Sequence, residues 1–145
     1  MKTKYLYLDV DGVLLGKDDP GSMEIVLARH AGEFLEYCLR HYECYWLTTH
    51  CKEGDASPVI KQLRAYVDGA ISGLIDAVKP TVWKTLKTEA IDLSSDFYWI
   101  DDGILQCEKE ILKRNNVFSR WIEVNTRKYP DDLKRAILIL EDMLY

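Results

Sequence analysis

A short apolar segment that ends on two closely spaced aspartates constrains this chain more than any other feature. Residues 5–8 read Tyr-Leu-Tyr-Leu and run directly into Asp9-Val10-Asp11-Gly12. The apolar segment fits the centre of a β-sheet, whereas the carboxylates require water, a hydrogen-bond donor or a cation. Gly12 allows a tight turn that directs backbone amides at an anion. A turn rich in Asp and Gly at a strand end can also be purely structural, so both interpretations stay open here.

Two further apolar segments also end on polar side chains. The segment 45–48 ends on Thr48, and the segment 97–102 ends on Asp101 and Asp102. Apolar residues at intervals of three and four lie between these segments, which is typical of helices that pack on a core. The chain therefore alternates between strands and helices.

This alternation predicts right-handed crossovers and a parallel sheet with helices on both faces. We expect a doubly wound α/β fold that forms a single domain over residues 1–145. The expected strands are 4–9, 44–48, 97–100 and 120–124, with a doubtful short strand at 70–71; the expected helices are 23–39, 58–67, 81–91, 105–113 and one that begins near Pro130.

The polar residues all follow the carboxyl ends of expected strands. In open α/β sheets, ligands bind beyond these ends, where the strand order reverses. Asp9, Asp11, Thr48, Asp101 and Asp102 come from three separate loops that lead to the same edge of the sheet. This convergence of polar residues predicts a functional site at the carboxyl edge of the sheet.

The order of these motifs resembles the haloacid dehalogenase-like hydrolase superfamily, whose members are chiefly phosphatases. An apolar segment ending in Asp-x-Asp-Gly-Val is followed by one ending in Thr, by lysines, and by one ending in Asp-Asp, from Tyr5 to about Val124. The resemblance implies that Asp9 attacks a phosphomonoester and forms an aspartyl-phosphate. It also implies that Asp11 protonates the leaving oxygen and then deprotonates the attacking water.

The resemblance further implies a magnesium ion. Mg²⁺ prefers octahedral oxygen ligands and usually takes one or two carboxylates together with waters and phosphate. Asp9 and Asp101 would supply carboxylates and Asp11 its main-chain carbonyl, while Asp102 would lie close to the ion.

The residues after the second strand have several interpretations. Thr48 would donate its hydroxyl to a phosphoryl oxygen, with Thr49 as the backup, although threonines are also common at strand ends for their β propensity. His50 and Cys51 follow at once and invite the hypothesis of a Cys-His nucleophile, but adjacent residues seldom face each other and no third orienting group is evident. His50 is better interpreted as a substrate contact.

Three lysines compete for the position beside the phosphate. Lys79 precedes a proline, as in many relatives, whereas Lys84 and Lys87 lie on the expected helix 81–91. Lys87 falls at the flank of the apolar side of that helix and Lys84 points away from it. We therefore expect Lys87 to be the active-site lysine, and any of the three can also be a surface charge.

Composition limits the partners. The chain has 145 residues, a formal net charge of −5 and a pI near 5.2, which argues against a general nucleic-acid or membrane-surface binder. No apolar run reaches the length of a bilayer span or resembles a signal peptide, and the four cysteines show no paired spacing. We expect a reduced, cytoplasmic protein.

Neither gap between the motifs is long enough for the cap domain that larger relatives insert. We therefore expect an open site. Such a site suits a large phosphorylated partner, a phosphorylated nucleic-acid end, or a small substrate covered by a second copy of the chain. The acidic net charge gives no support to the nucleic-acid end. The segment 133–144 is apolar over more than one stripe, which predicts a buried terminal helix or a homodimer interface.

Three function classes therefore remain. The first is a Mg²⁺-dependent phosphohydrolase, and the second is a catalytically idle relative that binds a partner through the same surface. The third is a phospho-receiver signalling domain, in which the acid pair comes early in the chain and a lone acceptor Asp follows. Here the Asp-x-Asp motif comes first and the acid pair last, which favours the hydrolase.

Overall fold

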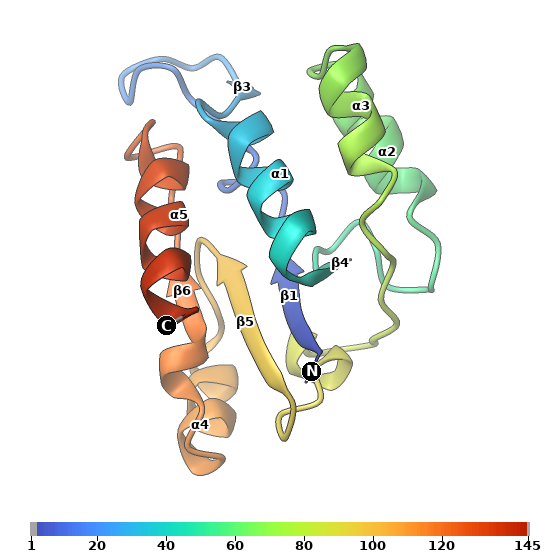
Figure 1. Cartoon of the computed structure of the whole chain (residues 1–145), viewed down its shortest axis with the longest axis vertical. Helices are drawn as coiled ribbons and strands as arrows, with labels where there is room; N and C mark the ends of the chain where they lie inside the picture. The colour runs from blue at the N-terminus through green and yellow to red at the C-terminus, as the bar shows by residue number, and fades with distance from the viewer. Residues whose placement is uncertain (1–2, 145) are drawn as a thin grey trace.

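A parallel β-sheet forms the centre of the computed structural model, which describes residues 3–144 (Figure 1). Within these residues the sheet has four strands, in the order β4 (Glu43–Trp46), β1 (Lys4–Leu8), β5 (Asp96–Asp101) and β6 (Trp121–Glu123). Leu8 is in register with both neighbours of β1, so the end of this strand lies in the middle of the sheet. The expected α/β class and parallel sheet are confirmed.

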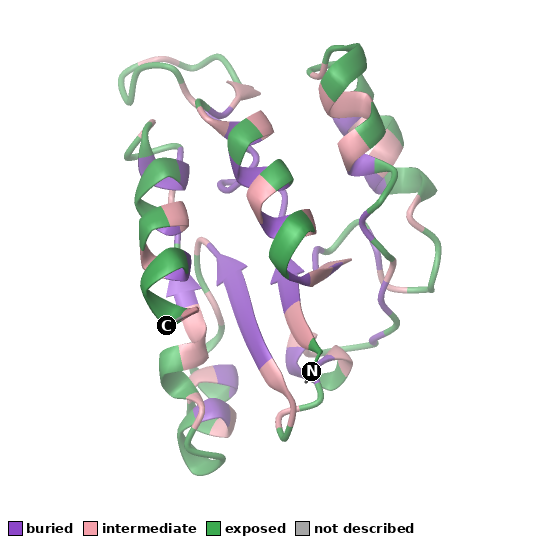
Figure 2. Ribbon diagram, viewed as in Figure 1, coloured by how far each residue is buried: buried purple, intermediate pink, exposed green. Residues whose placement is uncertain are grey.

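Helices flank this sheet. α1 (Ala31–His41) and α5 (Asp132–Met143) pack against each other and against one face (Figure 1). α4 (Gln106–Arg114) and the short 3₁₀ helix η1 (Lys87–Ala90) contribute to the apolar cluster on the other face. Both faces of β1 and β5 are consequently buried (Figure 2).

The apolar side chains form two clusters because successive strand residues point to opposite faces. Leu6 and Leu8 belong to the cluster with α1 and α5, whereas Tyr7 belongs to the cluster with α4. Three tryptophans are buried in these clusters: Trp46, Trp83 and Trp99.

The expected helix 23–39 is wrong in its first half. β2 (Leu15–Gly16) and β3 (Val26–Leu27) pair antiparallel, and α1 begins only at Ala31. The side chain of Met23, the first residue of the expected helix, is 91% exposed at the end of the connecting loop. Backbone pairing with the preceding segment therefore overrides the helical spacing here.

The segment after β4 is helical rather than extended. α2 (Ser57–Arg64) confirms the expected helix 58–67. The doubtful strand at 70–71 is wrong, because α3 (Gly69–Ile75) covers it and the Asp68 carboxylate caps that helix by accepting hydrogen bonds from two backbone amides.

The expected helix 81–91 is also wrong. Only η1 is helical there, and the side chain of Val82, near the start of the expected helix, is 67% exposed. The Glu89 carboxylate accepts hydrogen bonds from the backbone amides of Lys84 and Leu86. These contacts hold the segment as a loop that closes with one 3₁₀ turn.

The C-terminal third follows the expectations closely. α4, β6 and α5 lie within two residues of their expected starts. In α5, Leu133, Ala136 and Leu140 are buried, while Leu138 remains 56% exposed. The terminal helix therefore belongs to the core through one stripe, and the homodimer stays a prediction.

Two general properties complete the description. Within residues 3–144 all four cysteines are free thiols, and Cys107 alone among them is exposed. No helix in the same range is both long and apolar enough to cross a membrane.

Candidate functional site

Three aspartates meet at the carboxyl edge of the two central strands. Asp9 follows β1, and its backbone amide donates a hydrogen bond of 3.0 Å to the Ile100 carbonyl of β5. One carboxylate oxygen from each of Asp9, Asp101 and Asp102 lies within 4.8 Å of the others. The register of the sheet brings these distant residues together, as the sequence predicted.

The two aspartate turns also pack directly on each other. Gly12 has a φ of +79°, and a Cβ atom built on it would lie 2.2 Å from Asp102 Oδ2. The Asp102 carboxylate also has Arg127 nearby, whose Nη1 lies 3.8 Å from Oδ2. The glycine of the first motif therefore makes room for the last acid of the second.

Lys87 reaches this cluster from η1. Its Nζ lies 2.7 Å from Asp101 Oδ2 and 3.5 Å from Asp9 Oδ1, and its side chain is only 15% exposed. The structure therefore brings the expected lysine to the carboxylates. The expected helix was wrong, and a 3₁₀ turn positions the side chain instead.

The two competing lysines lie elsewhere. Lys79 extends the sheet beyond β4, where its backbone pairs with Cys44 and Trp46 and its ammonium pairs with Glu43. Lys84 is exposed on the loop before η1. Neither has an ion pair with the aspartate cluster in the described part of the chain.

Burial and crowding perturb the titration of the cluster. Burial, followed by the nearby charge of Asp9, raises the pKa of Asp101 to about 6. Burial, followed by the contact with Asp101, raises the pKa of Asp102 to about 6. Burial also raises the pKa of Asp9 although Lys87 opposes it, and both carboxylates hold the pKa of Lys87 above its usual value despite burial.

The donor set fits a divalent cation. Three clustered carboxylates carry three negative charges when ionised, and Lys87 supplies one nearby ammonium. Carboxylate oxygens are the ligands that Mg²⁺ prefers, and a bound cation would offset the remaining repulsion. Asp9, Asp101 and Asp102 are therefore the residues that could hold a metal ion.

Thr48 is buried in a tight turn at the same edge. The Leu47 amide donates to the Leu8 carbonyl, which places Thr48 just beyond the pairing of β4 with β1. The Thr48 hydroxyl accepts a hydrogen bond of 3.4 Å from the His50 amide. Thr49 is exposed instead and lines two adjoining cavities, of about 250 and 200 Å³.

Asp11 points away from the cluster of carboxylates. Its Oδ1 accepts a hydrogen bond of 2.9 Å from Gln62 Nε2, and its Oδ2 lies 3.1 Å from His50 Nε2. The carboxylate is therefore not part of the candidate metal site, and a contribution of the Asp11 carbonyl stays a prediction. Gln62 was missed, because one polar residue on a short helix carries no signal for a contact 51 positions away.

The side chains of His50 and Cys51 have different partners. The ring of His50, expected to contact substrate, lies against Asp11. The Cys51 thiol is buried and donates a long hydrogen bond to the Thr81 carbonyl. A Cys-His nucleophile is therefore not formed here.

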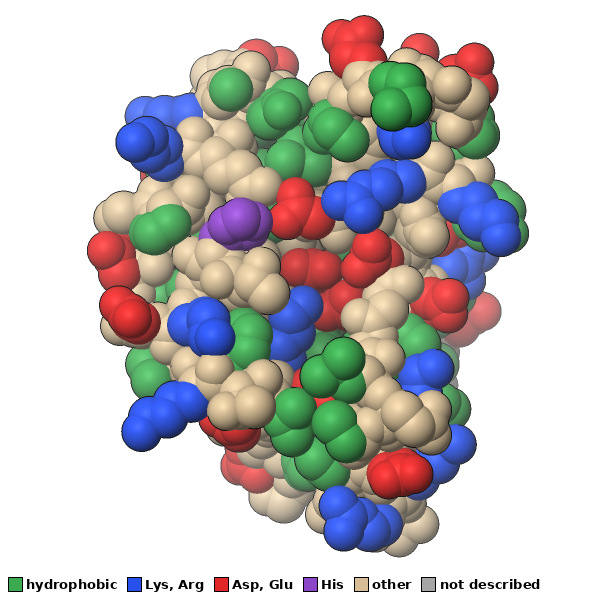
Figure 3. Space-filling model, turned by 180° about the vertical axis from the view of Figure 1, so that it is seen from behind, with side chains coloured by type: hydrophobic (Ala, Val, Ile, Leu, Met, Phe, Trp, Pro, Cys, Tyr) green, Lys and Arg blue, Asp and Glu red, His purple; other side chains and the backbone are tan. Residues whose placement is uncertain are grey.

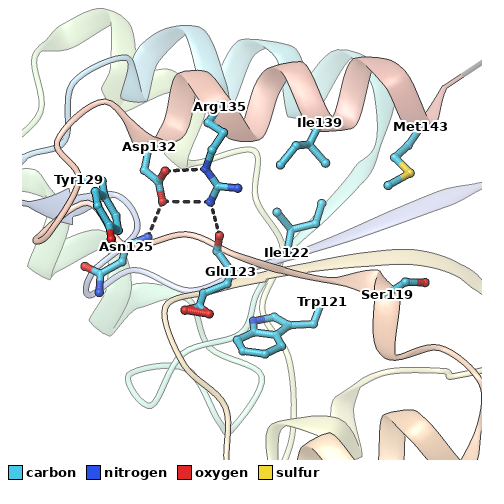
Figure 4. A pocket seen from close by; sticks show the side chains of 10 residues that line it. All are labelled: Ser119, Trp121, Ile122, Glu123, Asn125, Tyr129, Asp132, Arg135, Ile139 and Met143. Atoms are coloured by element: carbon cyan, nitrogen blue, oxygen red, sulfur yellow. Dashed lines mark hydrogen bonds and ion pairs between the residues drawn. The ribbon is translucent and has the colours of Figure 1, made fainter.

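Acidic side chains gather near the middle of one face of the molecule, with basic side chains around them (Figure 3). A cavity of about 580 Å³ lies apart from the cluster, between β6 and α5 (Figure 4). The polar side chains that line it are already paired with one another and with the backbone. Asp132 forms an ion pair with Arg135 and accepts a hydrogen bond from the Asn125 amide. Arg135 also donates a hydrogen bond to the Glu123 carbonyl. This cavity holds none of the predicted site residues.

Comparison with known proteins gives no relative to guide the interpretation. No protein family model matches the chain, and no curated protein is significantly similar to it. The functional interpretation therefore depends on the geometry of the site.

Proposed function

We propose that this chain is a Mg²⁺-dependent phosphohydrolase of the haloacid dehalogenase-like type, which works through an aspartyl-phosphate on Asp9. The observation that carries the proposal is the cluster of Asp9, Asp101 and Asp102, with Lys87 Nζ 2.7 Å from Asp101. Clusters of this kind at the carboxyl edge of a parallel sheet are suited to phosphate chemistry, which needs positioning and charge neutralisation.

In the first step, an oxygen of the Asp9 carboxylate attacks phosphorus. The bond from phosphorus to the leaving oxygen breaks, and Asp11 gives that oxygen a proton as the alcohol departs. Asp9 is suited to this role because it is 6% exposed at the end of a central strand, where its direction is fixed.

In the second step, Asp11 takes a proton from a water molecule that attacks the phosphorus of the aspartyl-phosphate. The bond between phosphorus and the Asp9 oxygen breaks, inorganic phosphate leaves, and both carboxyl groups return to their starting state. Asp11 is suited to both steps because its carboxylate lies outside the cluster, on the side of His50 and Gln62.

Lys87 would neutralise charge on the transferring phosphoryl group, and Thr48 would donate its hydroxyl to a phosphoryl oxygen while it accepts the hydrogen bond from the His50 amide. A magnesium ion held by Asp9, Asp101 and Asp102 would supply further charge neutralisation at the phosphoryl oxygens. The Asp11 carbonyl is the fourth ligand that we propose.

The substrate side of the site would be open. We propose a single doubly wound domain without a cap domain: residues 12–30 contain the β2–β3 hairpin, and residues 47–95 contain α2, α3 and η1. An open site suits a phosphomonoester on a large partner, or a smaller one covered by a second copy of the chain.

The test is phosphate release from a panel of phosphorylated metabolites, phosphopeptides and phosphorylated oligonucleotide ends. Each substrate is assayed with Mg²⁺, with EDTA, and with Asp9→Asn; Asp142→Asn, an exposed aspartate on α5, is the matched control. Release that needs Mg²⁺ and Asp9 but not Asp142 would support the proposal. Mg²⁺ binding without turnover of any substrate would favour an idle binding protein instead.

A further inference from the structure

The carboxylate of Asp11 is held on both sides by residues that the proposed reaction does not yet use. Gln62 Nε2 donates to one oxygen over 2.9 Å, and His50 Nε2 lies 3.1 Å from the other. The two partners come from different elements, α2 and the turn after β4. The Asp11 side chain is 38% exposed, so water can solvate it without them. The two contacts therefore set the direction of the Asp11 carboxylate and are not needed to solvate its charge.

Gln62 is held firmly in place. It lies on α2 beside Leu63, which together with Val59 anchors that helix in the core. Within the described residues, the Oε1 atom of Gln62 is buried without a hydrogen-bond partner. A buried polar atom without a partner is destabilising, so stability alone does not explain a glutamine at this position.

His50 links Asp11 to the second motif. Its ring contacts Asp11, while its backbone amide donates to the Thr48 hydroxyl. One short turn thus connects the residue proposed to bind the phosphoryl group with the residue proposed to move protons.

We infer that Gln62 and His50 are positioning residues that hold the Asp11 carboxylate away from the cluster of Asp9, Asp101 and Asp102 and ready for proton transfer. This inference rests on the proposed function. A carboxylate drawn onto a metal ion cannot hand a proton to a leaving group, so an acid so close to a cation site must be restrained. The amide of Gln62 is suited to this task, because it offers a donor to a carboxylate and an acceptor to a carboxylic acid.

The test compares aryl phosphates with good and poor leaving groups. A nitrophenolate leaves readily without a proton, whereas an unsubstituted phenolate depends more on the general acid. In Gln62→Met we expect kcat/KM for phenyl phosphate to fall about 10- to 100-fold and that for nitrophenyl phosphate less than about threefold. His50→Phe should show the same selectivity, and His50→Gln should recover part of the loss.

The controls are the other glutamine and another histidine of the chain. Gln106→Met on α4 and His41→Phe on α1 alter exposed residues with no contact to Asp11, and both should leave the two rates unchanged. Thermal unfolding identifies any variant that fails to fold, and Gln62→Glu, which places a repelling carboxylate beside Asp11, then replaces Gln62→Met.

The outcomes separate the two proposals. Equal loss with both substrates, or no loss with either, in the Gln62 and His50 variants would overturn the positioning role while leaving the phosphohydrolase in place. A wild-type protein that releases phosphate, with Mg²⁺ present, from neither aryl phosphate nor any substrate of the panel above would overturn the proposed function, and the positioning role with it.

Discussion

Gly12 lies directly against the carboxylate of Asp102, so that a Cβ atom at position 12 would fall 2.2 Å from Asp102 Oδ2. The contact joins the turn after β1 to the turn after β5, 90 positions later in the chain. The backbone of Gly12 also has a positive φ, which residues other than glycine rarely adopt. The last acid of the cluster therefore depends on the glycine of the first motif.

Gly12→Ala should damage both stability and metal binding. The added methyl group strains the left-handed backbone and displaces the Asp102 carboxylate, at a cost of about 1–3 kcal/mol in the free energy of unfolding. Urea unfolding measures that cost, and calorimetric titration with Mg²⁺ measures the affinity. Gly73→Ala on α3 is the control, because a Cβ there meets nothing within 4 Å. Unchanged Mg²⁺ affinity in Gly12→Ala would argue against the role of Asp102 as a ligand.

Lys87→Met removes the ammonium group that lies beside Asp9 and Asp101. The ammonium contacts Asp101, which is 1% exposed, so its removal should lower the free energy of unfolding of the metal-free protein by about 3 kcal/mol or more at pH 7. We also expect kcat to fall about 100- to 1,000-fold, because charge on the phosphoryl group is no longer neutralised. Lys84→Met is the matched control. Equal effects of the two substitutions would show that Lys87 has no special role.

Asp102 should make the metal-free protein less stable as the pH rises. Its pKa is about 6 in the folded protein, above the value of about 3.9 in an unfolded chain. A carboxyl group with a raised pKa contributes stability below about pH 4, and that contribution is lost as the pH rises through about 6. In EDTA, Asp102→Asn should therefore gain stability relative to wild type between pH 4 and pH 7. Parallel pH profiles of thermal unfolding for the two proteins would contradict this.

Magnesium should stabilise the folded protein through the same carboxylates. A cation at 100 times its dissociation constant adds about 2.7 kcal/mol to the free energy of unfolding. We expect Mg²⁺ to raise the Tm of wild type, EDTA to reverse the rise, and Asp101→Asn to remove most of it. Asp142→Asn, on the exposed side of α5, should respond as wild type does. An equal rise in all three proteins would place the effect outside the cluster.

The sequence predicts the site better than it predicts the connections around it. Asp9 and Asp101 each follow an apolar strand, and parallel strands bring such ends together whatever lies between them. The expected helix 23–39 wrongly included β3 of the β2–β3 hairpin, because the apolar spacing from residue 23 onward fits a helix until pairing with residues 15–16 selects a strand. The loop before η1 depends on the Glu89 carboxylate and its backbone contacts, which periodicity does not reveal.

Lys87 and Gln62 show which parts of the site depend on tertiary packing. The prediction of Lys87 depends on its position on an expected helix, 81–91, that does not form. Its contact with Asp101 therefore has a different cause, the 3₁₀ turn that begins at Lys87. Gln62 is absent from the predicted site, since its contact with Asp11 depends on how α2 packs on the core through Val59 and Leu63. Strand ends are set by local pattern, whereas the side chains that complete a site depend on tertiary packing.

The most direct test of the central claim is to trap the phosphoryl group on Asp9. The protein is mixed with an aryl phosphate that it hydrolyses and with Mg²⁺, then quenched in acid and reduced with borohydride, which converts an aspartyl-phosphate to homoserine. Mass spectrometry of the peptide that contains residues 5–17 then locates the change. We predict homoserine at position 9, present only with substrate and absent in Asp9→Asn. Steady hydrolysis with no modification at Asp9, or with modification at another carboxylate, would contradict the account.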